Sequence, residues 1–401
     1  MRVLRICALI PAVLLLASCG ANPPTPPPTN TAPATSTSAP PPPTATTLQP
    51  TQTIAAQPTI SPPSPTAEPP APTAQAASTP TPTPLSPGGW ALLTDSEGGP
   101  APAPRYDHSL VADPERHQLL LFGGRGSGTF GDTWLFDLAR EEWREVQGDG
   151  PPARFGAGAV YDEANRRVLL VMGQGDSGFF NDVWAFDLES EAWTQLKADR
   201  VADDEPRPRY GQSAALHKDG RVLISHGFSD QGRFDDTWAF DPGLAKWVNI
   251  TPTSGPIPLK RCLHELAYDP RDDLLLMFGG CSSGYGPCPQ GDLWALDLAS
   301  GTWTELQPQG EKPSPRSNPS IAYDPNRRAI FLFGGKAQDG PVSDTWVYML
   351  DANAWGSLES EISPSPRSSQ GTAYDPAQRK VYIAGGDTNE GPDMEVWVSG
   401  F

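Results

Sequence analysis

The stretch "GDTWLFDLAREEW" at residues 131–143 decides the fold, because it returns along the chain. In every full copy the two tryptophans stand nine residues apart, and a last copy, "MEVWVSGF" from Met394, ends with the chain before its second tryptophan. Six copies of one short unit predict a repeat architecture. The other full copies are "NDVWAFDLESEAW" (181–193), "DDTWAFDPGLAKW" (235–247), "GDLWALDLASGTW" (291–303) and the looser "SDTWVYMLDANAW" (343–355).

Each unit contains four short strand patterns. A proline-flanked arginine opens the unit, and a short apolar strand follows and ends in a tight turn. An apolar run ending in glycine comes next, as in "LLLFGG" (119–124), and a variable loop then leads to the Asp-x-Trp strand. The last strand begins at the second tryptophan, so each unit predicts one antiparallel sheet. The six arginines, 49 to 55 residues apart, are Arg105, Arg154, Arg209, Arg261, Arg316 and Arg367.

The pattern resembles the kelch repeat family, through the glycine doublet after an apolar strand and the spaced aromatic residue and tryptophan behind it. The resemblance covers 89–401 and implies an all-β, six-bladed kelch-type β-propeller with one four-stranded blade per repeat. The stretch "WALL" (90–93) matches the fourth-strand pattern but stands alone before the first arginine. We therefore expect a strand at Trp90 to complete the blade that residues 367–401 begin, because an open ring exposes two strand edges. Two repeats depart from the doublet, with "GQG" (173–175) and "HGF" (226–228), which leaves their turn geometry open.

The first residues have the form of an export signal. Arg2 and Arg5 precede an apolar run at 6–16 that is too short to span a bilayer comfortably. The following "LASC" (16–19) resembles the lipobox of bacterial lipoproteins. This resemblance implies a signal peptide at 1–18 and a lipidated Cys19 that anchors the mature protein to a bacterial membrane, outside the cytoplasm. The alternative is an ordinary secretory signal with an incidental cysteine.

Residues 19–88 are predicted to be a linker. From residue 20 onward they are almost all Pro, Thr, Ala and Ser, with one charge (Glu68) and no aromatic residue. Such a segment has too little apolar surface to offset its ordering entropy, so we expect a disordered stalk. Fully extended, it would reach about 200 Å.

Charge limits the possible partners of 89–401. The only charged residues before residue 89 are Arg2, Arg5 and Glu68, and without them 27 basic and 46 acidic residues remain, a net charge of −19. Nucleic acid and anionic lipid are bound through basic patches, so neither is expected as a partner. Membrane contact is therefore expected through the lipid anchor alone, and we expect a monomer.

The six arginines allow two interpretations. The segment before each first strand should lie on one face of the disc, where a ring of arginines could hold carboxylates, sulfates or sugar hydroxyls. Alternatively, each arginine pairs with the acid of its own repeat, and the stoichiometry of one acid per arginine favours this structural role. The six acids are Asp132, Asp182, Asp236, Asp292, Asp344 and Glu395.

The loops between strands two and three vary most between repeats, and loops on a rigid scaffold commonly carry specificity. Phe130, Phe180, Phe234 and Tyr285 recur on these loops beside small and acidic residues. They suit contact with a sugar, a peptide or a protein. Packing against the neighbouring blade explains them equally well.

Cysteine pairing stays open at this point. Apart from Cys7 and Cys19 the chain has three cysteines, at positions 262, 281 and 288. An extracytoplasmic location permits a disulfide. Cys281 and Cys288 bracket a loop that can bend back on itself, while Cys262–Cys288 and Cys262–Cys281 compete with that pairing.

Function is predicted as non-catalytic binding of a glycan, a wall component or a protein partner. The alternative is a kelch-fold carbohydrate-active enzyme, similar to galactose oxidase or to a sugar mutarotase, in which His108, Glu265 or Arg261 could act as acid–base groups. No residue is singled out as catalytic. His108 and His264 occupy the same repeat position in opposite blades, too far apart to share a metal with bonds of about 2 Å. We therefore predict no metal and no cofactor.

Overall fold

The computed structural model describes residues 89–94 and 99–400. The predicted signal peptide at 1–18, Cys19 and the predicted linker up to residue 88 lie outside this part of the chain. The described residues are all-β, and their one helical turn is the 3-10 segment η1 (Glu163–Asn165). None of them forms a helix long and apolar enough to cross a membrane.

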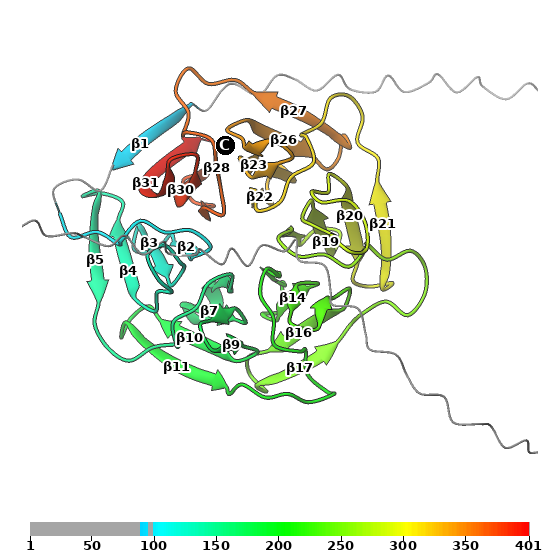
Figure 1. Ribbon diagram of the computed structural model, residues 1–401, viewed down its shortest axis with the longest axis horizontal. Helices are drawn as coiled ribbons and strands as arrows, with labels where there is room; N and C mark the ends of the chain where they lie inside the picture. The colour runs from blue at the N-terminus through cyan, green and yellow to red at the C-terminus, as the bar shows by residue number, and fades with distance from the viewer. Residues whose placement is uncertain (1–88, 95–98, 401) are drawn as a thin grey trace, which may run out of the picture. The chain divides into compact units, whose positions relative to one another are not determined.

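Six antiparallel sheets surround one axis, as Figure 1 shows, which confirms the predicted six-bladed propeller. The first strands contact one another around the ring and are therefore innermost. Short hairpins extend three of the loops between strands two and three. The first three blades are β2 (Ser109–Asp113), β3 (Gln118–Phe122), β4 (Thr133–Asp137), β5 (Glu142–Val146); β6 (Gly158–Asp162), β7 (Arg167–Val171), β10 (Val183–Asp187), β11 (Ala192–Lys197); and β12 (Ser213–Leu216), β13 (Val222–Ser225), β16 (Thr237–Asp241), β17 (Lys246–Asn249).

The last three blades follow the same order, and the sixth takes its outermost strand from the start of the described chain. These blades are β18 (Glu265–Asp269), β19 (Leu274–Phe278), β20 (Leu293–Asp297), β21 (Thr302–Leu306); β22 (Ser320–Asp324), β23 (Ala329–Phe333), β26 (Thr345–Met349), β27 (Ala354–Leu358); and β29 (Gly371–Asp375), β30 (Lys380–Thr388), β31 (Gly391–Gly400), β1 (Trp90–Thr94), with β28 (Arg367–Ser368) also on β30. The hairpins are β8 (Gln174–Gly175) with β9 (Gly178–Phe179), β14 (Phe228–Ser229) with β15 (Gly232–Arg233), and β24 (Lys336–Ala337) with β25 (Gly340–Pro341).

The hydrophobic core lies between neighbouring blades. In β3, Leu119 and Leu121 pack toward blade six, whereas Leu120 and Phe122 pack toward blade two. Both faces of a second strand are thus buried, which explains its unbroken apolar run. The outermost strand β5 buries Trp143 between exposed neighbours, because only one of its faces meets the core. Trp143 lies on Phe136, with 4.9 Å between ring centroids, and is thus part of the core.

The ring closes through the N-terminal strand. Antiparallel pairing of β1 with β31 sets Trp90 opposite Ser399 and Leu92 opposite Trp397. Figure 1 shows the two strands side by side at the rim, one from each end of the described chain. Trp90 is 4% exposed and packs on Phe331 and Phe333 of blade five. The expected closure is therefore confirmed.

The two repeats that lack the glycine doublet have the same backbone turn as the others. Met172 and His226 take φ values of 65° and 60°, close to the 67° and 70° of Gly123 and Gly279 at the same repeat position. A non-glycine residue at such φ is strained. The surrounding blade imposes the left-handed conformation even without glycine.

Candidate functional site

The six arginines are buried clamps inside their own blades. Arg105 donates two hydrogen bonds to the carboxylate of Asp132, at 2.6 and 2.8 Å, and others to the carbonyls of Gly123 and Ala103. The same arrangement recurs in all six blades, with Arg367 reaching both Asp393 and Glu395 in the sixth. The tryptophan two residues after the acid adds a bond to the same carboxylate, as Trp134 does to Asp132 at 2.8 Å.

This placement corrects the interpretation of the arginines as ligand contacts. All six are at most 1% exposed, and their donors are directed to the protein itself. In the Arg209–Asp236 pair, burial raises the pKa of the Asp236 carboxyl, but the hydrogen bonds and charge of Arg209 outweigh burial and hold this pKa below its ordinary value. The sequence signal that favoured pairing was the one-to-one stoichiometry of arginines and acids.

Three of the loop aromatics lie on these clamps. Phe130, Phe180 and Phe234 are half-buried, and each places its ring 4.0 Å from the guanidinium of its own blade's arginine. They cover the arginine of their own blade, a contact that neither of the two alternatives for these aromatic residues had included. Tyr285 differs, because its side chain is 51% exposed.

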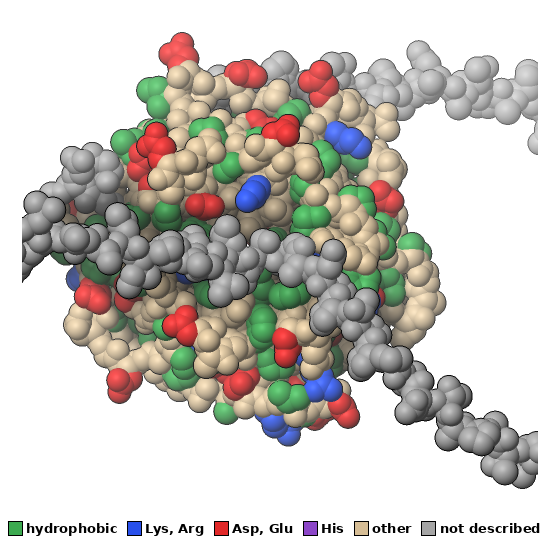
Figure 2. Space-filling view, viewed as in Figure 1, with side chains coloured by type: hydrophobic (Ala, Val, Ile, Leu, Met, Phe, Trp, Pro, Cys, Tyr) green, Lys and Arg blue, Asp and Glu red, His purple; other side chains and the backbone are tan. Residues whose placement is uncertain are grey.

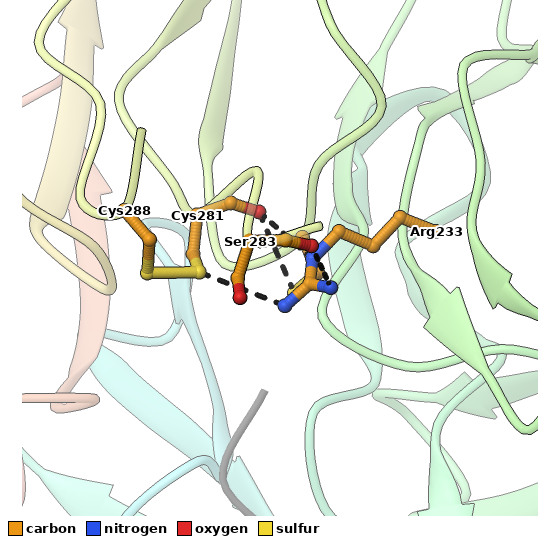
Figure 3. Close-up of a disulfide and its surroundings, with 5 residues drawn as sticks. Arg233, Cys281, Ser283 and Cys288 are labelled. Atoms are coloured by element: carbon orange, nitrogen blue, oxygen red, sulfur yellow. Dashed lines mark hydrogen bonds between the residues drawn. A yellow bond between two sulfur atoms is a disulfide. The ribbon is translucent and has the colours of Figure 1, made fainter. Parts of the chain in front are cut away.

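The loop that carries Tyr285 is fixed in two ways. Cys281 and Cys288 form a disulfide, and Cys262 is buried and takes no part in it, which resolves the three pairings. Arg233 of β15, in blade three, donates to the carbonyls of Cys281 and Ser283 at 3.1 and 2.6 Å, as Figure 3 shows. Arg233 was missed because its partners are backbone atoms 48 and 50 residues further on.

An aromatic cluster, in which Phe155 and Tyr210 are buried and the other rings half-buried, leads toward this loop across blades one to three. We define it as Tyr106, Phe155, Phe179, Tyr210 and Phe228. Arg125 lies over the rings of Tyr106 and Phe155, at 4.7 and 4.5 Å. Phe179, Tyr210 and Phe228 are in ring contact with one another, and Phe228 meets Arg233.

The aromatic cluster lies on the side of the disc that carries the loops between strands two and three. Backbone bridges join the segment after each arginine to the end of a second strand, as between Tyr106 and Arg125. The segments before strand one therefore share a face with those loops, here called the loop face. Turns between strands one and two and between three and four lie on the opposite face.

A closed ring of backbone hydrogen bonds surrounds the axis. The second residue after each arginine has φ between 49° and 63° and donates its N–H to the carbonyl of the equivalent residue in the preceding blade, at 2.7 to 3.3 Å. We call this ring the axial belt. No sequence pattern predicts the axial belt, because its members share a backbone conformation and not a residue type. They are Asp107, Gly156, Gly211, Leu263, Asn318 and Ser369.

A cavity of about 230 Å³ lies on the axis, lined by the belt and by the first residues of the inner strands. Glu265 and Gln212 line it. Glu265 accepts a hydrogen bond from the Ser213 hydroxyl at 2.9 Å. Burial raises the pKa of Glu265 to about 7, although this hydrogen bond works to lower it.

The other acid–base candidates are placed differently. His108 and His264 line the cavity but are 7% and 1% exposed. Burial and the charge of Arg105 lower the pKa of His108 to about 3, so its ring is neutral. Arg261 is one of the clamps. Within residues 89–94 and 99–400, no three His, Cys, Asp or Glu side chains are grouped so that they could hold a metal ion.

Fold and site together define a six-bladed kelch-repeat propeller with a structured loop face. A model of the KLHDC2/KLHL20/DRC7 Kelch-repeats domain matches residues 90–280 and 249–398. The chain therefore belongs to this kelch-repeat family.

Named relatives share the kelch region only in part. Human host cell factor 1 is 29% identical over 256 residues, which is 59% of this chain and 12% of the relative. Human host cell factor 2 is 25% identical over 68% of this chain and 37% of its own length. The rat Rab9 effector protein with kelch motifs is 29% identical over 46% of this chain and 50% of its own length. The match thus spans half or less of each of these relatives.

Proposed function

We propose that this protein is a lipid-anchored, extracytoplasmic kelch propeller whose loop face binds a protein partner. The relatives support the coarser part of the proposal, a propeller that serves as a protein-interaction module. One of them is named as a Rab9 effector protein with kelch motifs. The anchor and the location rest on the "LASC" stretch at 16–19.

One observation carries the choice of the loop face. Tyr285 and Leu259 are 51% and 46% exposed, and a side chain at Gly286 would meet Leu259 at 2.6 Å, so the two apolar groups belong to one loop cluster. The disulfide and Arg233 hold this exposed pair beside the buried and half-buried aromatic cluster. Rigid, exposed aromatic groups next to arginine are typical of interaction hot spots.

Charge directs the choice of partner. Figure 2 shows acidic side chains spread over the viewed face with few Lys or Arg between them, in keeping with the net charge of 89–401. Such a surface attracts a partner with a basic patch and repels anionic polymers. We therefore favour a basic protein over an anionic wall polymer or a sulfated glycan.

Affinity capture on the full chain tests the binding. We expect Tyr285→Ser and Leu259→Ser to lose a protein that the parent chain retains. Leu244→Ser is the matched control, because Leu244 is 75% exposed in the turn between β16 and β17 on the opposite face. Retention that survives protease but is lost on glycosidase treatment would instead identify a glycan.

Fractionation tests the anchor. Changing Cys19→Ser removes the proposed lipid site and should move the protein from the membrane fraction to the soluble extracytoplasmic fraction. Cys7→Ser, within the same signal, is the matched control and should leave the protein with the membrane. Equal membrane retention of both variants would remove the anchor from the proposal.

The alternative function, a kelch-fold sugar mutarotase, is favoured by one feature, the carboxyl of Glu265 in the axial cavity with a pKa of about 7. A group that titrates near neutral pH can both accept and donate a proton. Polarimetry of a freshly dissolved aldose tests this alternative. It predicts catalysed mutarotation that Glu265→Gln abolishes.

A further inference from the structure

The axial cavity contains a carboxylate that is only partly satisfied. Within the described residues Glu265 accepts one hydrogen bond, from Ser213, and no basic side chain pairs with it. The neighbouring acid Asp107 is different, because Arg125 lies 3.0 Å from its carboxylate. Burial of an unpaired carboxylate is costly, so the site favours a positively charged guest.

A second polar group in the cavity lacks a partner. Gln212 is 5% exposed, and within residues 89–94 and 99–400 neither its amide oxygen nor its amide nitrogen has a hydrogen-bond partner. A buried side-chain amide without partners is uncommon in a native protein and calls for an explanation. These amide atoms are themselves buried, so the carboxylate of Glu265 is the group that a guest in the cavity can meet.

The shape of the cavity limits the guest to one narrow group. At about 230 Å³ the cavity is smaller than most pockets for drug-sized ligands. Side chains at the belt positions point along the ring and not into the lumen: a Cβ at Gly211 would meet Leu263 at 2.9 Å, and one at Gly156 would meet Tyr210 at 2.8 Å. The cavity is further lined by aliphatic side chains, those of Leu110, Leu266 and Ile321.

We propose that the axial cavity receives the ammonium group of one lysine side chain of the protein partner. This inference rests on the proposed function, because it specifies which type of residue of the bound partner enters the axial cavity. A lysine has an aliphatic stem for the aliphatic lining and a compact charge with three donors. One oxygen of Glu265 already accepts from Ser213, so the carboxylate is less suited to the bidentate fork of an arginine.

Calorimetry with a lysine mimic tests the inference without the partner. The probe is Nα-acetyl-lysine N-methylamide, titrated into the full chain at pH 8, and the comparison ligands are the uncharged norleucine and the arginine equivalents. We expect one-to-one binding of the lysine mimic with a Kd of about millimolar, because so small a ligand makes few contacts. The norleucine mimic should not bind, and the arginine mimic should bind more weakly.

Two variants locate the binding. Glu265→Gln should raise the Kd of the lysine mimic by about tenfold or more, because it removes the negative charge that the ammonium group contacts. Glu305→Gln, the same change on the exposed strand β21 of the same blade, should leave the Kd unchanged. Ala159→Leu adds bulk to the cavity lining without changing charge and should also abolish binding.

Three results would overturn the inference: equal binding of the lysine and norleucine mimics, undiminished binding to Glu265→Gln, or no binding of the lysine mimic to the parent chain. An aldose that competes with the lysine mimic would favour the enzyme. Since capture through Tyr285 and Leu259 is measured separately, failure here leaves the proposed function standing.

Discussion

Trp90 donates its indole N–H to the hydroxyl of Thr345 at 3.1 Å and so joins the first described strand to a blade formed 255 residues later. Trp193 does the same to Thr133 of the preceding blade, at 2.9 Å. In these two blades the tryptophan of the fourth strand therefore binds the preceding blade, whereas the indole N–H groups of Trp143, Trp247 and Trp303 are buried and have no hydrogen-bond partner among the described residues. At Trp90 this bond also closes the ring.

Loss of this contact should destabilise the whole propeller. Trp90→Ala removes a large buried side chain, and we expect a loss of about 3–5 kcal/mol in the free energy of unfolding. Trp90→Phe keeps much of the packing and should cost less. Deletion of 20–80, most of the predicted linker at 19–88, is the control and should leave the melting temperature unchanged. A parent-like melting temperature for Trp90→Ala would contradict the closure.

The arginine clamps should behave as buried ion pairs. Arg209→Ala leaves the largely buried Asp236 carboxylate without its partner, and we expect a loss of about 3–5 kcal/mol. Arg144→Ala is the matched control, because Arg144 is 54% exposed and pairs with Glu191 in solvent, where such a pair contributes about 0–1 kcal/mol. Chemical denaturation measures both. Similar small losses for the two variants would argue against a structural clamp.

The free energy of unfolding should depend on pH through the titration of Glu265. Its folded pKa, about 7, lies above the ordinary value, so the folded state binds a proton more tightly than the unfolded chain. The stability from this group is complete below the ordinary pKa and is lost as the pH rises through 7. Glu265→Gln resembles the protonated form and should be more stable than the parent at pH 8, on the order of 2 kcal/mol, and equal to it at pH 4.

Other titrating groups do not obscure this comparison. His108 and His226 have folded pKa values lowered to about 3. Their contribution to the free energy of unfolding is therefore lost as the pH falls below the ordinary histidine pKa, which is the opposite direction to that of Glu265. Both the parent and Glu265→Gln retain these histidines, and their difference isolates Glu265. A difference between the two proteins that does not change with pH would contradict the raised pKa.

The disulfide predicts a definite thiol pattern. Peptide mapping of the unreduced protein should link Cys281 to Cys288 and find Cys262 in no disulfide. Cys288→Ser frees the Tyr285 loop and should cost about 2–4 kcal/mol. It should also weaken partner capture, whereas Cys262→Ser leaves the loop closed. Three free thiols in the unreduced protein would contradict the pairing.

The sequence predicted the architecture because the repeats carry it in local form. Six arginines in phase predict six blades, and the isolated "WALL" at 90–93 predicts the closing strand. The pairing of arginine with acid was also within reach, since each repeat carries one of each. These features depend on spacing along the chain, which a repeat preserves.

The site was less predictable because its contacts cross between blades. Arg233 binds carbonyl oxygens of the next blade, and no side-chain pattern records such partners. Glu265 was recognised as an acid–base candidate, but its cavity is formed by the belt, whose members range from glycine to leucine. Exposure separated Tyr285 from the three phenylalanines at similar loop positions, and exposure depends on the blade-four loop as folded.

The central claim, that the loop face binds a protein, is tested most directly by photo-crosslinking in cells that produce the full chain. A benzoylphenylalanine replaces Tyr285 in one variant and Leu244, on the opposite face, in the other. Our account predicts a discrete protein adduct from position 285 and none from position 244. An adduct from position 244 with none from position 285 would contradict it.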